Sequence, residues 1–504
     1  MGEDRQSRMA ALTWPQRTPL GGMEPAPLMA PSMRPARADA PQADKRIGSL
    51  AAAFDACRIT DGATLSFHHH YRNGDRLLNA VLAEAARRGL RGLTIAPSAL
   101  FPVHAPLGAH MQSGVVARIV TDYAKGAAAD AMLSGVLDTP ALLQSHGGRA
   151  RALRTGALLV DVAFVGASLA RPDGACTGRG GVLACGPLGY AMVDADHARR
   201  TVVCANEITG GPLPHTDIPA VQVDAVLPFP HPGDVNGIAS DTTVPAQTPQ
   251  ARHIGDRVAQ VIAATGLMRD GLSLQTGAGG YSLAAVPPIG AAMAQAGVRG
   301  SFVSGGITGA HVALQRAGLF GVLHDVQCFD AAAVASSVTN PDHHAMSACA
   351  YANPLNRDAT VNRLSVMVLG AVEIDATFNV NVTIGGDGRL IGGPGGHPDA
   401  AHGAALTIVT TGVTAGGYAK LVDHVRCVTT PGADVDVLIT NHGIAVNPAR
   451  SDIAKDLHRA GLPLHSFAAL QSIAQAGATL KPSPMAPEPR LFVEHRAGGI
   501  LDWA

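Results

Sequence analysis

The sequence lacks the features of membrane, secreted and nucleic-acid-binding proteins. It contains no run of about 20 consecutive apolar residues, so it predicts no membrane-spanning helix. Its seven cysteines include no CxxC pair, and such an odd, dispersed set favours reduced thiols in a cytosol over a disulfide framework or a zinc site. Its formal net charge of −1 leaves no overall basic field to hold a nucleic-acid backbone.

Aromatic residues are also scarce, at 4%, whereas glycine and proline number 58 and 34. This combination suits close packing of small residues between helices and sheets, with many tight loops. The hydrophobic fraction of 47% is ample for buried cores. A length of 504 residues exceeds one ordinary domain and fits about three domains or two large α/β domains.

The first 45 residues are rich in proline, alanine, arginine and methionine without periodicity, which predicts a flexible leader over residues 1–45. Acidic residues occur early and no apolar core of signal-peptide length follows, so the cytoplasm is the expected location. Order is expected to begin near Ile47.

Two long segments then share one rhythm of short apolar runs, small-residue loops and alanine-rich helical stretches. In the first, an amphipathic helix at residues 76–90 precedes a buried strand, "GLTIAPSAL". Strands that alternate with helices pair in parallel, so we expect an α/β fold with two open, mostly parallel sheets covered by helices on both faces. A proline-rich stretch after residue 214 marks the crossing, and the domains are expected at residues 46–220 and 221–504.

Glycines follow two strands of the second segment, where each strand ends. They are Gly277, Gly279, Gly280, Gly305 and Gly306. Such turns let the backbone approach a ligand at the carboxyl edge of a sheet, and their N–H groups attract a phosphate or an oxyanion. Tight turns or close packing are the alternative. A dinucleotide fingerprint is incomplete, because Ser282 stands where its last glycine belongs.

Two further stretches carry polar candidates. His146 and Arg149 flank a glycine pair, and Arg149 could grip a carboxylate or phosphate, with an ordinary surface arginine as the alternative. Asn441, His442 and Asn447 follow the buried strand "DVLI", where polar clusters indicate either turn chemistry or a site.

The stretch "SFHHHYRNGD" contains three consecutive histidines. It looks extended, and neighbours on a strand point to opposite faces. His68, His70 and Arg72 would then share one face while His69 turns away, so no metal site is expected at the triplet. Two imidazoles and an arginine suit a polycarboxylate, although each histidine could equally be a packing group. Asn73 joins the candidates for substrate binding.

Eight blocks of the sequence occur in this order: "SFHHHYRNGDRLLNAVLAEAARRGLRGLTIAPSAL", "VHAPLGAHMQSGVVARI", "SHGGRARAL", "ACGPLGYAMVDADHA", "SLQTGAGGYSLA", "YANP", "EIDATFNVNV" and "TNHGIAVNPARSDIA". Together they resemble the alpha subunit family of citrate lyase, the citrate CoA-transferase subunit. The resemblance runs from about Gly48 to the C-terminus and leaves the leader out. The second half is also similar to the wider CoA-transferase superfamily.

The resemblance implies two CoA-transferase domains and a cytoplasmic complex with a lyase (beta) subunit and an acyl carrier (gamma) subunit. The carrier would supply a phosphopantetheine-type thiol, with acetyl-CoA as a surrogate substrate, and this chain would bind no cofactor tightly. The chain would convert acetyl-carrier and citrate into citryl-carrier and acetate.

One departure from the superfamily bears on the mechanism. In its best-known class a glutamate attacks the thioester, and that position falls near Gly305, where no carboxylate stands. Covalent catalysis by glutamate is then unavailable, so a citrate carboxylate is expected to attack the acetyl thioester within a ternary complex. Orientation can lower the barrier by ~7–11 kcal/mol and each oxyanion donor by ~3–4 kcal/mol.

The expected roles divide the candidates into groups. Backbone N–H groups at Gly279, Gly280, Gly305 and Gly306 would stabilise the oxyanion. Citrate would be bound by His68, His70, Arg72, His146 and Arg149, with Asn73 and His442 as further binding candidates. Asn379 and Asn381 would orient acyl groups.

Three other functions remain open. A related transferase or thioester hydrolase would accept another carboxylic acid, and a scaffold subunit would keep the fold without turnover. A nicotinamide enzyme is disfavoured by the incomplete glycine fingerprint and by the lack of an obvious ribose-binding acid.

Overall fold

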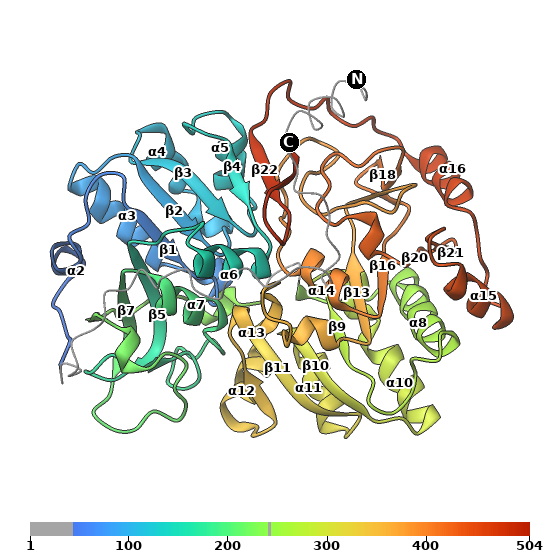
Figure 1. Ribbon diagram of the computed structural model, residues 1–504, viewed down its shortest axis with the longest axis horizontal. Helices are drawn as coiled ribbons and strands as arrows, with labels where there is room; N and C mark the ends of the chain where they lie inside the picture. Colours follow the sequence, from blue (N-terminus) through green and yellow to red (C-terminus); the bar gives the residue numbers. More distant parts are fainter. Residues whose placement is uncertain (1–43, 240–242) are drawn as a thin grey trace.

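The computed structural model describes residues 44–239 and 243–504, and it shows two lobes side by side (Figure 1). All but the last two residues of the expected leader lie outside the described residues. Each lobe is built on a mostly parallel sheet covered by helices, so the α/β class predicted from the sequence is confirmed.

The first lobe contains a ten-stranded sheet with the order β23-β22-β4-β3-β2-β1-β5-β7-β8, and β6 pairs with β5. Its strands are β1 (Thr64–Phe67), β2 (Leu93–Pro97), β3 (Val116–Thr121), β4 (Ala141–Leu143), β5 (Val162–Ala170), β6 (Cys176–Thr177), β7 (Arg200–Ile208), β8 (Ala225–Pro228), β22 (Leu491–Glu494) and β23 (Ile500–Trp503). Its helices are α2 (Leu50–Cys57), α3 (Leu77–Arg87), α4 (Leu107–Gln112), α5 (Ala127–Leu133), α6 (His146–Thr155) and α7 (Gly189–His197).

The second lobe contains an eight-stranded sheet with the order β12-β11-β10-β9-β13-β16-β20-β21. Its strands are β9 (Leu274–Thr276), β10 (Gly300–Ile307), β11 (Phe320–Cys328), β12 (His343–Ala345), β13 (Val366–Gly370), β16 (Leu406–Thr410), β20 (Val437–Ile439) and β21 (Ile444–Val446). Its helices are α8 (Pro249–Ala264), α9 (Gly280–Ala284), α10 (Val286–Ala296), α11 (Gly309–Arg316), α12 (Ala331–Thr339), α13 (Ala348–Ala352), α14 (His397–Gly403), α15 (Ser451–Arg459) and α16 (Phe467–Gly477).

Two small sheets complete the second half of the chain. They are formed by β14 (Glu373–Asp375), β15 (Val380–Asn381) and β19 (Leu421–Val422), and by β17 (Thr414–Ala415) with β18 (Tyr418–Ala419).

Local sequence explains where the long helices begin and end. The Thr248 side chain accepts the N–H of Ala251, and Pro249 occupies the first turn of α8, where its missing N–H costs nothing. The buried face of α8 includes Ile254 and Val258, which follow helical spacing. Helix α10 ends at Gly297, whose φ of +66° is the left-handed conformation that glycine adopts without strain.

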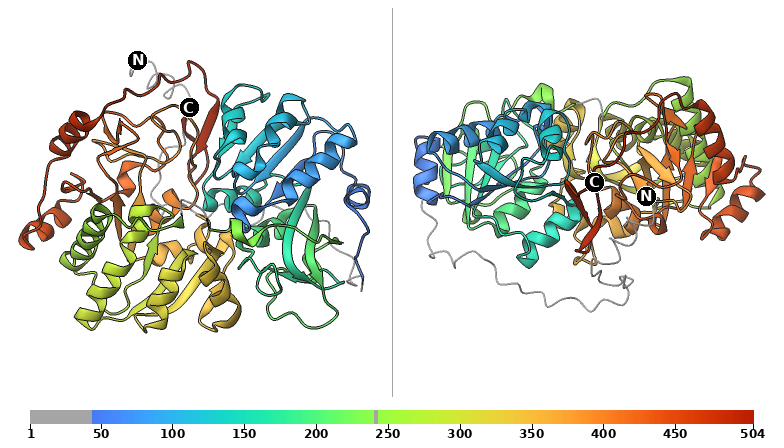
Figure 2. Two further views of the ribbon diagram at one scale, coloured as in Figure 1. Left: turned by 180° about the vertical axis from the view of Figure 1, so that it is seen from behind. Right: turned by 90° about the horizontal axis from the view of Figure 1, so that it is seen from above.

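The expected domain boundary at residues 220 and 221 does not separate the two sheets. Strand β8, which follows the expected boundary, pairs with β7 in the sheet of the first lobe. The C-terminal strands also join this sheet, with β22 beside β4 and β23 beside β22. Both views of Figure 2 show this last hairpin against the first lobe. Apolar periodicity reports that these segments are strands but carries no information on which sheet they join.

A hydrophobic core shared by both lobes joins them. It contains Tyr190 and Val193 of α7 from the first lobe, and Phe302, Val326 and Tyr351 from the second. Cores that interlock in this way hold two sheets at a fixed separation, since packed interiors deform little.

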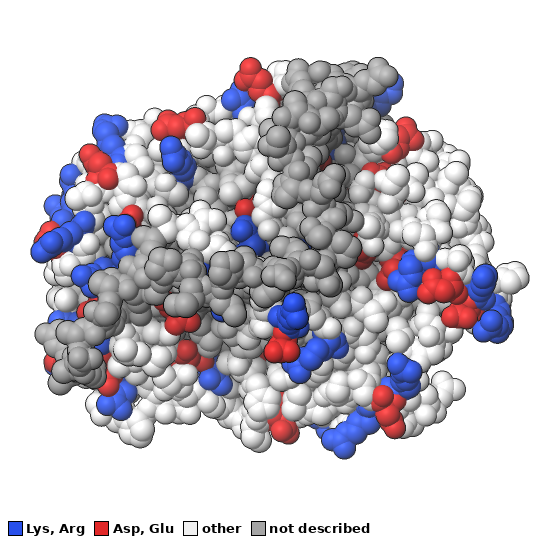
Figure 3. Space-filling view, viewed as in Figure 1, with Lys and Arg blue, Asp and Glu red and all other residues white. Residues whose placement is uncertain are grey.

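The distribution of charged side chains on the surface is consistent with the near-zero net charge. On the face shown in Figure 3, basic and acidic side chains are interspersed. No helix among the described residues is both long and apolar enough to cross a membrane.

The returning strand β22 is expected to stabilise the first lobe. Leu491 of β22 is fully buried in the core of the first lobe, so Leu491→Ala should lower the free energy of unfolding by about 2–5 kcal/mol. Leu480→Ala is the control, because Leu480 is 50% exposed. Urea unfolding followed by circular dichroism measures both, and equal midpoints for the two variants would contradict the role of β22.

Candidate active site

A cavity of about 340 Å³ lies between the lobes and is lined by both. The strands β1, β9, β11 and β13 end at its wall, and cavity residues follow each strand end directly or within two positions. Those residues are His69, Gly277, Phe329 and Ala371. The cavity therefore occupies the carboxyl edges of both sheets, where open α/β sheets bind ligands.

The histidine triplet faces the cavity differently from the expected arrangement. His69 lines the cavity, whereas His68 and His70 do not. The rings of His68 and His70 do lie parallel, with centroids 6.2 Å apart, so they share a side as expected. Arg72 does not share it, because β1 ends at Phe67 and the strand alternation ends with it.

Each histidine of the triplet has its own partner. His70 Nε2 lies 2.8 Å from the carbonyl oxygen of Gly166, and His69 Nδ1 lies 2.6 Å from Ser98 Oγ. Burial, followed by the nearby charges of His146 and Arg72, holds the pKa of His69 well below its usual value. The His69 side chain is therefore a neutral part of the cavity wall at physiological pH.

Arg72 lines the cavity between the two lobes. Its guanidinium carbon lies 4.9 Å from the ring centroid of Phe101 in the first lobe and 5.0 Å from that of Phe329 in the second. Burial lowers the pKa of Arg72 to about 10, so the side chain remains a cation at neutral pH. Its backbone has a φ of +52°, a left-handed conformation that is uncommon for a non-glycine residue and turns the chain after the triplet.

His146 also lines the cavity, at the start of α6. Its Nδ1 lies 2.8 Å from Oδ2 of Asp122, whose side chain is fully buried. Burial raises the pKa of Asp122, and the hydrogen bond from His146 opposes that effect. The backbone N–H of His146 donates to Gly395 of the second half of the chain, so this side chain is fixed from both sides.

Arg149 and His68 form a buried ionic cluster away from the cavity. Arg149 Nη2 lies 2.6 Å from Asp194 Oδ2, and His68 Nε2 lies 3.1 Å from the same oxygen. Neither side chain lines the cavity. Their expected role in binding citrate is therefore not supported by their position, because the Arg149 guanidinium and the His68 ring already contact Asp194.

The two glycine loops do meet at one cavity. Gly279 and Gly306 line it, together with Gly277, whereas Gly280 and Gly305 do not. Gly305 has a φ of +96°, and a Cβ there would lie 2.7 Å from the side chain of Gln275. Glycine is thus required at this position because the Gln275 side chain packs closely against its backbone, and not because the residue contacts a substrate.

The remaining four expected residues lie outside the cavity. Asn381 donates to Glu373 and to the carbonyl oxygen of Ile384, and Asn379 donates to Asp375 and Thr377. Asn73 accepts the N–H of Val103 and is exposed, as is His442. None of these four expected residues lines the cavity.

Sequence reasoning missed part of the wall. The segment at residues 392–396 lines the cavity, followed by His397, whose pKa is lowered to about 4 by burial. Tyr190, Tyr351 and Gln275 also line it. The signal for the first was the "GGPGG" run itself, since four glycines around one proline favour close approach of the backbone to a ligand.

The wall has an unusual charge distribution. Among the described residues that line it, none is Asp, Glu or Lys. At neutral pH Arg72 supplies a fixed positive charge, and His146 faces the same space with its partner Asp122 behind it. Such a wall can bind a polyanion, and it offers no side-chain carboxylate as a nucleophile.

The buried cluster around Asp194 is expected to support the fold rather than substrate binding. Burial acts to raise the pKa of Asp194, but Arg149 and His68 hold it below its usual value. A carboxyl whose pKa is lowered by folding stabilises the fold at pH values above its pKa in the unfolded chain, which is roughly 3.9 for aspartate. This contribution is lost as the pH falls from that value through the lower pKa of the folded state.

Asp194→Asn should therefore lower the free energy of unfolding at pH 7 by about 3–5 kcal/mol, since it leaves Arg149 buried without its counter-charge. It should also flatten the loss of stability below pH 4. Asp130→Asn, which breaks the exposed pair with Arg389, is the control and should change neither. Urea unfolding between pH 3 and pH 8 measures both, and an unchanged acid limb in Asp194→Asn would contradict the pairing.

The sequence of this chain matches one known protein family over nearly its whole length. The family model described as citrate lyase, alpha subunit (CitF), matches residues 43–504. The citrate lyase alpha chain of Klebsiella pneumoniae is 40% identical over 456 residues, which is 90% of each chain. That of Escherichia coli K12 is 39% identical over 503 residues, covering 99% of this chain and 97% of the relative.

Solved structures extend the comparison. One described as the alpha subunit of citrate lyase from Streptococcus mutans, in complex with citrate, superposes with a TM-score of 0.90 at 36% identity. It covers 94% of this chain and 93% of that one. A 4-hydroxybutyrate CoA-transferase from Porphyromonas gingivalis shares the fold, with a TM-score of 0.55 at 17% identity over 86% of this chain and 97% of that one. The chain therefore belongs to the citrate lyase alpha subunit family, and it shares its fold with a CoA-transferase.

Proposed function

We propose that this chain exchanges acyl groups between a carrier thiol and citrate, converting acetyl-carrier and citrate into citryl-carrier and acetate. The observation that carries the proposal is the cavity between the lobes, which has a buried arginine and no side-chain carboxylate among the described residues of its wall. The family membership and the relative in complex with citrate support citrate as the acid.

The proposed reaction needs no nucleophile from the protein. A citrate carboxylate oxygen attacks the carbonyl carbon of the acetyl thioester, and the carbon–sulfur bond breaks with its electron pair on sulfur. The thiolate then attacks the citryl carbonyl of the mixed anhydride, and the carbon–oxygen bond to acetate breaks. One thioester replaces another, so the exchange is nearly isoenergetic, and the protein contributes mainly orientation and charge stabilisation.

Arg72 is the proposed anchor for citrate. It is a cation held between Phe101 and Phe329, and a guanidinium binds carboxylates with two parallel hydrogen bonds. His146, oriented by Asp122, would contact a second carboxylate of citrate. The Asn379 and Asn381 side chains are left out of this proposal because they hold the chain elsewhere.

The oxyanion donor is proposed at the first glycine loop. The N–H of Gly277 already donates to the carbonyl oxygen of Val368, and that of Gly279 donates to Gly277. Ala278 lies between them on the cavity wall, and its N–H has no acceptor among the described residues. It is therefore the donor proposed for the tetrahedral oxyanion, and the glycines on either side provide space.

The proposed partners follow from the same reaction. The acyl group would arrive on a phosphopantetheine-type thiol of an acyl carrier (gamma) subunit, and a beta subunit would cleave the citryl product. The thioester would enter the cavity as a substrate, so this chain needs only to admit and orient it.

Acyl exchange should be directly visible by mass spectrometry. The purified chain, incubated with acetyl-carrier and citrate, is expected to convert the carrier from the acetyl to the citryl mass. Replacing citrate with succinate should give little exchange, because a smaller dianion meets fewer wall contacts. Free thiol as the main product would instead favour a hydrolase, and unchanged acetyl-carrier would favour a scaffold.

Arg72→Ala should raise the KM for citrate roughly 10- to 100-fold, the usual value of a hydrogen bond to a charged group, and should leave the KM for acetyl-carrier nearly unchanged. Arg72→Lys should fall between, since it keeps the charge without the paired donors. Arg118→Ala, on the exposed side of β3, is the control. Equal effects of Arg72→Ala on both KM values in steady-state kinetics would reject the proposed role.

A further inference from the structure

Three buried side chains converge at the carboxyl end of β11, and the proposed reaction does not use them. Asp325 and Cys328 belong to β11, and His343 begins β12. Their relative exposures are 0%, 0% and 3%. The donor atoms of all three lie within 4.8 Å of one another. In residues 44–239 and 243–504 no other group of three or more such side chains converges as closely.

The polar atoms of the cluster divide into an inner and an outer set. Asp325 Oδ2 lies 3.0 Å from Cys328 Sγ and 3.0 Å from His343 Nε2. Asp325 Oδ1 accepts the N–H of Gln327 at 2.8 Å, and His343 Nδ1 lies 3.0 Å from Ser336 Oγ. One oxygen, one sulfur and one nitrogen therefore point inward, while the outer atoms are held in place by neighbours.

We propose that Asp325, Cys328 and His343 bind one zinc ion. Carboxylate, thiolate and imidazole are the protein ligands of zinc, whereas calcium and magnesium take oxygen ligands. The outer contacts fix the imidazole and the carboxylate in the way that partners of metal ligands do. Binding forms a metal–sulfur bond and releases the thiol proton to solvent.

Charge balance also favours a divalent ion at this depth. One thiolate and one carboxylate carry two negative charges, and the imidazole is neutral, so a doubly charged cation makes the site neutral overall. A neutral site carries the smallest penalty for burial away from water. Three protein ligands leave the fourth position of a tetrahedral ion for a water molecule.

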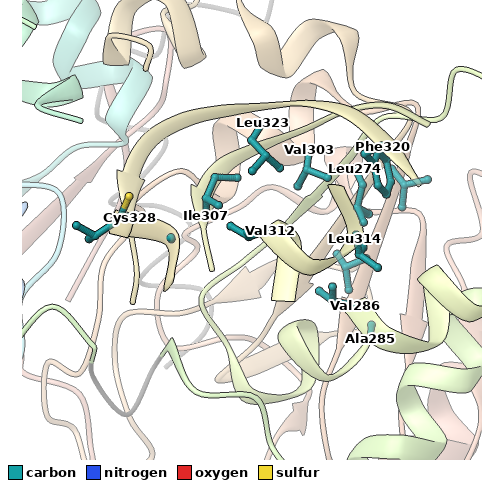
Figure 4. Packing of buried hydrophobic residues seen from close by; sticks show 14 of the residues in the cluster. Leu274, Ala285, Val286, Val303, Ile307, Val312, Leu314, Phe320, Leu323 and Cys328 are labelled. Atoms are coloured by element: carbon teal, nitrogen blue, oxygen red, sulfur yellow. The ribbon is translucent and has the colours of Figure 1, made fainter. Parts of the chain in front are cut away.

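The ion would stiffen the wall between the lobes. It would tie β11 to β12, a strand of three residues at the edge of the sheet. The adjacent Gln327 lines the cavity and donates from Nε2 to the carbonyl oxygen of His69 at 2.7 Å. Figure 4 shows Cys328 at the end of its strand, and a Cβ on Gly186 of the first half of the chain would lie 2.5 Å from its sulfur.

Metal analysis of the untagged full-length chain tests the proposal. After removal of metal with a chelator and reconstitution with zinc chloride, we expect one zinc per chain by elemental mass spectrometry. Competition against a chromophoric chelator gives the Kd, which should weaken by at least about 10- to 100-fold in Cys328→Ser and in His343→Gln. Magnesium and calcium should not compete.

Two matched variants control for non-specific binding. His344→Gln changes the exposed histidine next to His343, and Cys204→Ser changes a fully buried thiol elsewhere. Both should bind zinc like the wild type. Cobalt(II) in place of zinc should give a sulfur-to-metal charge-transfer band in the near ultraviolet, and Cys328→Ser should lose it.

The proposal is overturned by a stoichiometry well below one ion per chain, or by Cys328→Ser binding zinc as tightly as the wild type. If both ligand variants fail to fold, the cobalt spectrum of the wild type decides the question. Absence of the charge-transfer band would then show that the three side chains form only a hydrogen-bonded cluster.

Discussion

The site depends on one constraint, which is that the carboxyl edges of two mostly parallel sheets face each other across a shared core. Tyr190 and Val193 from the first lobe pack with Phe302, Val326 and Tyr351 from the second, and this core sets the width of the gap. Because packed interiors deform little, the strand ends keep their separation and the cavity keeps its shape. The contact between Gln327 and the carbonyl oxygen of His69 ties the two walls directly.

The distribution of charge around that gap explains the proposed chemistry. Charged groups needed for stability, such as Arg149 with Asp194, are paired inside the first lobe and do not reach the cavity. Among the wall residues that the structure describes, Arg72 is the fixed cation, and none carries a carboxylate that would compete with an anionic substrate. A substrate acid can therefore serve as nucleophile in a space where the protein supplies orientation and hydrogen bonds.

Periodic apolar patterns predicted most of the fold, because strands such as β5 and helices such as α8 bury continuous or amphipathic faces. The glycine loops were also placed near one cavity, since strand ends share an edge. Side-chain direction was not predictable beyond the end of β1 at Phe67, and His69 lines the cavity instead of turning away from it. Likewise, the partner of Arg149 lies 45 residues away on α7, and sequence spacing gives no sign of that pairing.

The most direct test of the account follows one oxygen atom. In a single turnover with enzyme in excess over acetyl-carrier, citrate labelled with oxygen-18 in its carboxylates should transfer one labelled oxygen to the released acetate. This result is required if the citrate carboxylate itself attacks the acetyl thioester. Acetate without label in the first turnover, with the label retained on the polypeptide, would mean that a protein carboxylate performs the attack and would contradict the account.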